Sequence, residues 1–466
     1  MTVAESIDPV LAGPIPPERP LSLFQTLRLL PRNQFAVFPR AAYEQPIYEM
    51  RGVFGHVFLV HDPEGVRQVL LDNVSNYPKA EIERRALGAL LGDGILISEG
   101  ETWRTHRRAM APAFDPRSIQ SYVPAMTEAA ETFLAGWDRR TPGEVVNIAA
   151  EMTDVTLRII ARTMFSTDSE GVGEVIERTF SRALQILSFN AADAVPGLRE
   201  MRFRQRERTL RANSAELDGW IYRFIEARAK APGEGTKDLL ARLVAARDEQ
   251  TGAGLSPKAL RDEVVTIFVA GHETTAVAMT WVWYLLSQHP LQEARLHAEL
   301  DRVLGGRAPT AEDVPNLPYA RMLIEESMRL YPPAPGLSIR QPVADDVVCG
   351  VRIPKTAGVA ILPWILHRHR ALWDHPERFD PERFSPERSA GRPRFAYLPF
   401  GGGPRICIGM QLAMTETIVL LAAIAQRYRL RLAPGEVVEL APKVTLKARN
   451  GLRTTLEPRW PDRVAA

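Results

Sequence analysis

The residues best suited to chemistry lie in the glycine-rich run Phe400–Gly409, which contains Cys407, one of the two cysteines of the chain. Three consecutive glycines at 401–403 let the backbone approach a flat group closely and adopt left-handed angles. Cys407 stands where a final helix is expected to begin, and the helix dipole and free N–H groups there stabilise a thiolate. A single thiolate in such a cradle suits the axial ligand of a haem iron. The alternative is a glycine loop with an incidental buried cysteine, and the length of the run argues against it.

A second candidate lies in the middle of the most apolar segment, at residues 270–275 (AGHETT). Glu273 and Thr274 place an acid beside an alcohol, and a buried acid is costly unless it is paired or functional. Gly271 permits a kink that can admit water or a small ligand. The run also begins like the zinc-protease motif His-Glu-x-x-His, but Ala276 replaces the second histidine. A polar patch that serves helix packing is the remaining alternative.

Two further groups of charged residues have helical spacing. Trp103 and Arg107, four residues apart, share a helix face and can both donate to a carboxylate. Glu326 and Arg329, three residues apart, also share a face, and Arg383 follows within Pro-Glu-Arg-Phe. Taken alone, these groups are typical of a basic surface helix and of solvated helix charges.

Together these motifs resemble those of the cytochrome P450 monooxygenases. The family's haem-binding signature, Phe-x-x-Gly-x-Arg-x-Cys-x-Gly, is matched at every fixed position, by Phe400, Gly403, Arg405, Cys407 and Gly409. The runs at 270–275, 326–329 and 103–107 are similar to the family's oxygen-activation, Glu-x-x-Arg and Trp-x-x-x-Arg motifs and occur in the same order. The resemblance covers the chain from about Tyr43 to Arg459.

The resemblance implies a haem b cofactor and assigns the residues around it. Cys407 would be the axial ligand of the iron. The two haem propionates would be held by Trp103, Arg107, Arg340 and Arg405, because buried carboxylates demand paired donors. Other contacts with the cofactor would come from Ala270, Gly271, Phe400, Gly401 and Gly409.

The resemblance also implies catalytic, structural and substrate-binding roles. Glu273 and Thr274 would deliver protons to bound oxygen. A buried network that braces the cysteine loop would consist of Glu326, Arg329 and Arg383. The substrate would meet the segments 81–97 (taken as a loop) and 186–198, and the residues Val269, Ala270, Gly336, Leu337 and Thr445. These positions are largely apolar, so a fatty acid, a terpenoid and an aromatic compound all remain open.

The leading function is that of a monooxygenase, which inserts one oxygen atom of O2 into a C–H or C=C bond of a hydrophobic small molecule. The alternatives are a haem-thiolate isomerase, dehydratase or peroxygenase without a redox partner, and a non-catalytic haem sensor or carrier. The intact pair Glu273-Thr274 favours the first. The chain has no Gly-x-Gly-x-x-Gly fingerprint and no cysteine cluster for an iron–sulfur centre. Electrons are therefore expected from a separate ferredoxin-type or flavodoxin-type protein.

Composition limits the class of protein. The 58 basic and 56 acidic side chains give a net charge of only +2, which argues against a nucleic-acid binder. Two cysteines cannot form a disulfide framework and favour a reducing, cytoplasmic location. Residues 1–40 show no secretory signal. The one candidate membrane span, Val264–Leu286, has polar residues at its middle and is better explained as a buried helix than as a transmembrane segment.

The pattern predicts a mainly α protein with a small β region (α+β) and a long central helix over a buried haem. Ser256-Pro257 should cap that helix, which would run to Gln288 over about 50 Å. Helices are expected across 115–247, with breaks near 190–197 and 231–235. Short strands are expected at 53–60, at 347–353 (including Cys349) and at 358–362, and the chain should end in a helix from about 408 to 428 and a β region. Prolines predict an extended arm at residues 1–40, followed by a single catalytic domain at 41–466.

Overall fold

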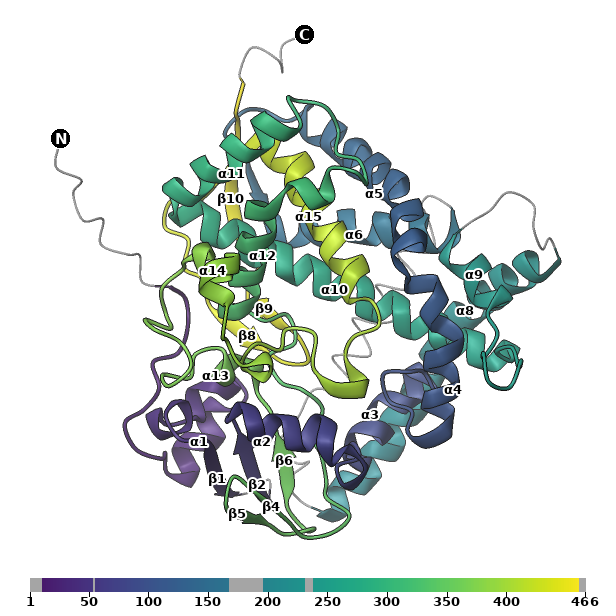
Figure 1. Cartoon of the computed structure of the whole chain (residues 1–466), viewed down its shortest axis with the longest axis vertical. Coiled ribbons are helices and arrows are strands. Elements are labelled where there is room, and N and C mark those ends of the chain that lie inside the picture. The colour runs from purple at the N-terminus through teal and green to yellow at the C-terminus, as the bar shows by residue number, and fades with distance from the viewer. Residues whose placement is uncertain (1–10, 53–54, 167–195, 231–237, 461–466) are drawn as a thin grey trace.

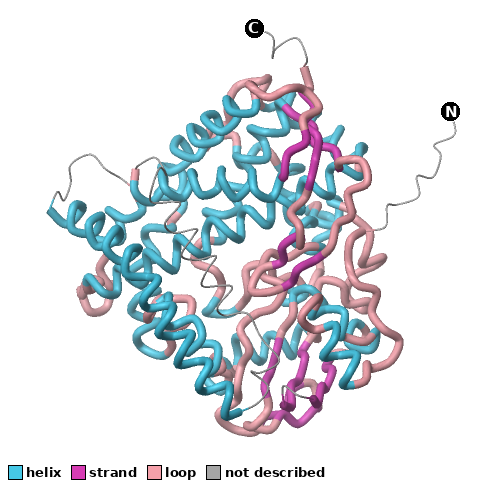
Figure 2. Tube along the Cα trace, turned by 180° about the vertical axis from the view of Figure 1, so that it is seen from behind, coloured by secondary structure: helices cyan, strands magenta, loops and turns pink. Residues whose placement is uncertain are grey.

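The computed structural model describes residues 11–52, 55–166, 196–230 and 238–460 (Figure 1). Its helices are α1 (Leu23–Leu29), α2 (Pro63–Arg67), α3 (Glu81–Leu91), α4 (Gly100–Met110), α5 (Pro116–Trp137), α6 (Ile148–Phe165), α8 (Pro196–Lys230), α9 (Leu239–Ala245), α10 (Pro257–Gln288), α11 (Pro290–Val303), α12 (Pro318–Leu330), α13 (Pro363–Leu366), α14 (Pro386–Ser389) and α15 (Met410–Arg427). Its strands are β1 (Ile47–Gly52), β2 (Gly55–Val60), β3 (Val145–Asn147), β4 (Asp346–Val348), β5 (Val351–Ile353), β6 (Gly358–Ala360), β7 (Tyr428–Leu432), β8 (Leu440–Pro442), β9 (Leu446–Ala448) and β10 (Arg453–Pro458). The predicted fold class, mainly α with small sheets, is confirmed. Seen from behind, the strands gather along one side of the molecule (Figure 2).

The long helix α10 begins and ends at the predicted residues. The Ser256 side chain accepts a hydrogen bond from the backbone N–H of Ala259, and Pro257 occupies the first helical position. The helix assignment is continuous through Gly271. It ends at Gln288, where the next helix starts with a proline. Among the described residues, no helix is both long and apolar enough to cross a membrane.

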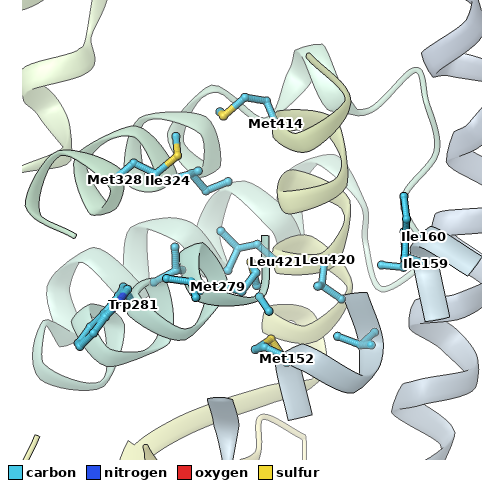
Figure 3. Close-up of a cluster of buried hydrophobic side chains, with 14 of the residues drawn as sticks. Met152, Ile159, Ile160, Met279, Trp281, Ile324, Met328, Met414, Leu420 and Leu421 are labelled. Atoms are coloured by element: carbon cyan, nitrogen blue, oxygen red, sulfur yellow. The ribbon is translucent and has the colours of Figure 1, made fainter. Parts of the chain in front are cut away.

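The core is built around α10, where α6, α12 and α15 pack against it (Figure 3). The Trp281 ring stacks on Tyr331 with the ring centroids 4.3 Å apart, and its indole N–H donates to the Leu446 carbonyl at 2.7 Å. Each large apolar side chain buried in this way contributes about 1.5–3 kcal/mol to folding. The packed helices are represented in Figure 3 by Met152, Ile160, Met279, Trp281, Ile324, Met328, Met414, Leu420 and Leu421.

The sheet β1-β2-β6 positions two cations. Strand β2 pairs antiparallel with β1 and parallel with β6. Arg340 extends this sheet through isolated bridges to Val359 of β6 and to Lys79. Two segments that are more than 250 residues apart in the sequence therefore place Lys79 and Arg340 side by side.

Several elements differ from the sequence predictions. Residues 23–29 form α1, so the N-terminal arm is not extended throughout. Strand β3 interrupts the stretch predicted to be helical, because the segment after Trp137 turns at Gly143 with φ +81°. The segment 81–91, taken as a loop, is the helix α3. The predicted break at 231–235 lies outside the described residues, as does most of the break at 190–197, and α8 begins at Pro196.

Cys349 does not lie in a strand. It forms a two-residue turn with Gly350 between β4 and β5, and the two residues have φ angles of +46° and +77°. Positive φ at both positions matches the twist of a tight hairpin. The last helix, α15, begins at Met410 with Gly409 as its N-cap, so Cys407 precedes the helix by three residues.

Glu416 of α15 gives the fold a pH dependence. Its carboxyl group is buried, which raises its pKa from 4.5 to about 8, and its Oε1 has no hydrogen-bond partner among the described residues. A group whose pKa is raised in the folded state stabilises the fold at low pH, and it loses that contribution as the pH rises from about 4.5 to 8 at about 1.4 kcal/mol per pH unit. We therefore expect Glu416→Gln to raise the free energy of unfolding at pH 8 and to change it little at pH 4.5. Urea unfolding at the two pH values measures the difference, and equal effects at both would contradict the assignment.

Candidate active site

The loop 400–409 holds Cys407 through backbone contacts. The Cys407 N–H donates to the Phe400 carbonyl at 2.9 Å, and Arg107 of α4 donates to the Ile406 carbonyl at 2.8 Å. Gly403 has φ +65°, and a Cβ at this position would lie 1.9 Å from the Leu70 carbonyl oxygen. Only glycine fits there, because both the angle and the close approach exclude a side chain.

The surroundings of Cys407 suit a metal-bound thiolate more than a free one. Its side chain is accessible on one side, yet burial by protein on the other sides raises the pKa of the thiol, against the opposing effects of the Gly409 N–H and the Arg107 charge. The expected stabilisation by a helix dipole is weaker than predicted, since α15 starts only at Met410. Coordination to a metal ion removes the proton of such a thiol.

A cluster of cations lies next to this loop. The Arg405 guanidinium sits 4.0 Å above the Trp103 ring, contacts Glu99 at 2.6 Å and donates to the Ser98 carbonyl at 2.8 Å. Arg340 is buried, and its Nε has no hydrogen-bond partner among the described residues. Of the four predicted propionate donors, the structure groups Trp103, Arg340 and Arg405, while Arg107 of α4 instead donates to the Ile406 carbonyl of the cysteine loop.

Lys79 completes the cation cluster, and sequence reasoning missed it. It is buried, and its ammonium group donates to the Leu96 carbonyl. Burial, followed by the charges of Arg405 and Arg340, lowers the pKa of Lys79 to about 7. No motif marks this lysine, because its neighbours in the cluster lie far away in the sequence.

The cation cluster fits the carboxylates of a haem. Buried charges are normally paired, but three cations (Lys79, Arg340, Arg405) here share the nearby acids Glu83 and Glu99. The unpartnered Nε of Arg340 and the depressed pKa of Lys79 show that their charges are incompletely compensated. A cofactor with two anionic groups would complete the compensation.

The middle of α10 exposes one narrow stripe. Between Leu260 and Leu286 every residue is buried except Ala270, Gly271 and Thr274. These three positions, spaced i, i+1 and i+4, share a face. The Thr274 hydroxyl donates to the Ala270 carbonyl at 2.6 Å. Because the rest of this part of α10 is buried, a bound small molecule can contact the helix only at this stripe.

The Glu273 side chain points away from this stripe and is buried. Its Oε1 accepts a hydrogen bond from the Thr445 hydroxyl at 2.7 Å and lies 2.8 Å from the Lys447 ammonium. A small pocket between α6, α10 and β9 adjoins it, lined in part by Thr153 and Lys447. The Lys447 side chain is half exposed, so this pair connects the buried acid with solvent. The Thr445 hydroxyl, expected to contact substrate, is engaged by Glu273.

The predicted structural trio comes together at the end of α12. Arg329 donates to both carboxylate oxygens of Glu326, at 2.6 and 2.8 Å, and Arg383 lies 3.4 Å from the same carboxylate. Both Arg329 and Glu326 are fully buried. Arg329 also donates to the carbonyls of His367 and Pro376. The trio therefore fixes the segment that leads to the cysteine loop.

His367 carries this bracing to the loop itself. Burial lowers the pKa of His367 to about 3, so the ring is neutral, and its Nε2 accepts the Leu398 N–H at 2.8 Å. Leu398 lies two residues before Phe400. His367 and His369 are both buried, and no group of three metal-binding side chains occurs in the described part of the chain.

The remaining predicted substrate positions differ in their accessibility. Val269 is buried, while Gly336 and Leu337 are partly accessible. A Cβ on Gly336 would lie 3.1 Å from Leu362, so the chain is closely packed there. Leu337 faces Gly401, where a Cβ would lie 3.9 Å from it. The segment 186–195 lies outside the described residues.

Comparisons with known proteins agree with this geometry. The sequence model of the family described as Cytochrome P450 matches residues 14–452. Cyclooctatin synthase of Streptomyces melanosporofaciens is 39% identical over 413 residues, which are 86% of each chain. Cyclooctat-9-en-7-ol 5-monooxygenase of the same organism is 36% identical over 392 residues, 84% of this chain and 83% of that one. The crystal structure of the cytochrome P450DA heme domain is similar with a TM-score of 0.84 and 27% identity, covering 97% of this chain and 99% of that one.

Proposed function

The chain belongs to the cytochrome P450 family, and we propose that it oxidises a cyclic terpenoid with electrons from a separate ferredoxin-type or flavodoxin-type protein. It is a monooxygenase with a haem b cofactor, acting on a hydrophobic small molecule. The observation that carries the site assignment is the Cys407 loop beside a cation cluster. Of the substrate classes that the sequence left open, the terpenoid is favoured, because one relative is named for a cyclic alkenol rather than for a linear acid or an aromatic compound.

The chain supplies the residues that hold the cofactor. Cys407 binds the iron, and the loop glycines leave room for the flat ring. The two haem carboxylates are bound by Trp103, Lys79, Arg340 and Arg405. Arg107 and the Gly409 N–H temper the negative charge of the sulfur. When bound, the haem supplies the activation of O2 and the transfer of one oxygen atom.

Proton delivery is divided between two side chains of α10. The Glu273 carboxylate is held by Lys447 and Thr445, and the half-exposed Lys447 side chain connects it with solvent. Thr274 presents its hydroxyl on the accessible stripe and is oriented by its bond to the Ala270 carbonyl. Because the two side chains leave the helix in different directions, a proton passes between them through water or by rotation of Glu273. Thr445 is thus a positioning residue for Glu273.

Thr274→Ala tests this division. The variant loses the hydroxyl that delivers the proton but keeps every cofactor contact, so we expect normal haem content and O2 consumption with only a small fraction of it coupled to product. Parallel measurement of O2, peroxide and product gives the coupling ratio. The matched control is Thr275→Ala, whose hydroxyl makes the same kind of bond, to the Gly271 carbonyl at 3.0 Å, but is buried. Wild-type coupling in Thr274→Ala, or equal uncoupling in the control, would remove the relay assignment.

The substrate class is tested by the spin-state change of the ferric protein on binding. A panel of cyclic alkenes and alkenols, linear fatty acids and aromatic compounds should produce the change most strongly with the first group. Turnover of the best binder is then assayed with ferredoxin, reductase, NADPH and O2. A response confined to fatty acids would overturn the terpenoid proposal. Product with peroxide alone, and none with O2 and electrons, would favour the peroxygenase alternative.

Two exposed or half-exposed arginines of α4, Arg104 and Arg108, could offer positive charge to an acidic redox partner, but both are already paired. Arg108 pairs with buried Asp248 at 2.7 Å, and Arg104 pairs with Glu101. Ion pairing reduces the charge that either arginine offers to an acidic partner. We also propose a cytoplasmic location, because neither of the two cysteines forms a disulfide.

A further inference from the structure

Three consecutive charged residues, Arg261, Asp262 and Glu263, are buried near the start of α10. The proposed reaction uses none of them. Burying charge is unfavourable unless partners compensate, so their contacts indicate what they hold. Arg261 donates to the Leu90 carbonyl at the end of α3 at 2.9 Å and to Asp218 of α8 at 2.6 Å. The other two residues hold the segment that follows α3.

Asp262 and Glu263 bind the backbone of residues 92–98, here called the strap. Asp262 accepts the Asp93 N–H at 2.9 Å, and Glu263 accepts the Ile95 N–H at 3.0 Å. The second oxygen of Glu263 lies 2.7 Å from Nδ1 of His106 on α4. The Glu263 side chain is fully enclosed, so its orientation is fixed by these two partners.

The strap is pressed against α10 too closely for side chains. Gly92 has φ +58°, and a Cβ there would lie 2.2 Å from the Asp262 carboxylate. A Cβ on Gly94 would lie 2.0 Å from the Thr266 hydroxyl. Two glycines are therefore required for the carboxylates to reach the strap's N–H groups.

The carbonyl groups of the strap accept hydrogen bonds from two members of the cation cluster. The Leu96 carbonyl accepts from Lys79, and the Ser98 carbonyl accepts from Arg405 at 2.8 Å. Within the strap, the N–H groups of Ile97 and Ser98 both donate to the Gly94 carbonyl at 3.0 Å. The strap is thus a closed turn. Because peptide groups are planar, the strap N–H groups that bind α10 constrain the direction of the strap carbonyls that bind the cations.

We propose that Glu263 is a positioning residue for the cofactor: through the strap, it holds Lys79 and Arg405 where they face the haem carboxylates. The inference rests on the proposed role of those two cations. Without the Glu263 carboxylate, the Ile95 N–H loses its acceptor, and the Leu96 and Ser98 carbonyls are no longer held in direction. Both cations then bind the haem carboxylates from a wider range of positions.

The test measures haem transfer from the ferric holoenzyme to excess apomyoglobin, a readout that does not depend on catalysis. We expect Glu263→Ala to lose haem about tenfold faster, equivalent to about 1.4 kcal/mol, and Glu263→Gln, which keeps an acceptor for Ile95, to stay near the wild-type rate. Amide exchange at 93–98 should accelerate in the alanine variant alone. If Glu263→Ala fails to fold, Glu263→Asp replaces it, because the shorter side chain retracts the carboxylate from the strap.

The matched control is Glu299→Ala. Glu299 is also a buried acid that accepts two backbone N–H groups, those of Tyr319 and Ala320, but it lies on α11. This variant should lose stability and keep the wild-type haem transfer rate. If haem transfer from Glu299→Ala were accelerated as much as from Glu263→Ala, the role of Glu263 would be merely structural. Arg405→Gln separates the role of the cations from the role of Glu263. Faster transfer in Arg405→Gln with a wild-type rate in Glu263→Ala overturns this inference alone, whereas a wild-type rate in Arg405→Gln overturns the cation assignment itself.

Discussion

Replacing Cys407 with serine is expected to reduce monooxygenation to background while leaving the protein folded. The serine hydroxyl has nearly the size of the thiol but does not ionise to a strong electron donor, so it cannot supply the thiolate that the chemistry needs. The loop should keep its shape, since its contact with the Phe400 carbonyl uses the backbone N–H of residue 407 rather than the side chain. Product formation with a supporting redox system, compared at equal protein concentration, measures the loss.

The second cysteine supplies the control for this experiment. Cys349 lies in the β4–β5 turn, and its sulfur is 3.4 Å from Asp62. Burial together with the Asp62 charge raises the pKa of the Cys349 thiol to about 11, so it stays protonated at neutral pH. Cys349→Ser should therefore retain wild-type activity. Substantial activity in Cys407→Ser, or loss of activity in Cys349→Ser, would show that the wrong cysteine has been assigned.

Glu326→Ala is expected to have the largest effect on stability. The change removes the acceptor of Arg329, the partner of Arg383 and the acceptor of the Asp380 N–H. Removing one member of a buried ionic network leaves uncompensated charge inside the protein, which costs about 3–5 kcal/mol. Urea unfolding should show this loss. Haem retention should also fall, because the network fixes the segment that leads to the cysteine loop.

The neighbouring residue Glu325 provides a matched substitution on the same helix. Its carboxylate is largely buried but pairs at 3.2 Å with one arginine, Arg321, whose half-exposed side chain carries the pair to solvent. Pairs of this kind contribute about 0–1 kcal/mol, so Glu325→Ala should shift the unfolding midpoint far less than Glu326→Ala. Equal midpoints for the two variants would contradict the assigned role of the Glu326 network.

Local chemistry explains which parts of the fold the sequence could predict. The bounds of α10 were predicted because Ser256, Pro257 and Pro290 act within a few residues of the helix ends. The β4–β5 hairpin was missed because 347–353 was taken as one strand, although Gly350 marked a possible tight turn. Strand β3 was missed because it is only three residues long and owes its place to pairing with β10, some 300 residues later.

The residues of the candidate site also fall into those that local sequence predicts and those that depend on distant contacts. Cys407, Arg405 and the Glu326 network were predicted from motifs with fixed spacing, because their residue types stand in short runs of sequence. Lys79 could not be predicted, because its place depends on a bridge to Arg340 rather than on its own neighbours in sequence. The contact of Thr445 with Glu273 likewise depends on how the β8–β9 hairpin packs against α10. Contacts between distant segments need the folded chain.

The central claim is that Cys407 presents a thiolate to the iron of a haem b. The most direct measurement is the absorption spectrum of the reduced wild-type protein before and after addition of carbon monoxide, with Cys407→Ser beside it. We predict the strongly red-shifted Soret band of thiolate ligation in the wild type and its absence in the variant. A wild-type spectrum without that shift, or the same shift in Cys407→Ser, would contradict the assignment.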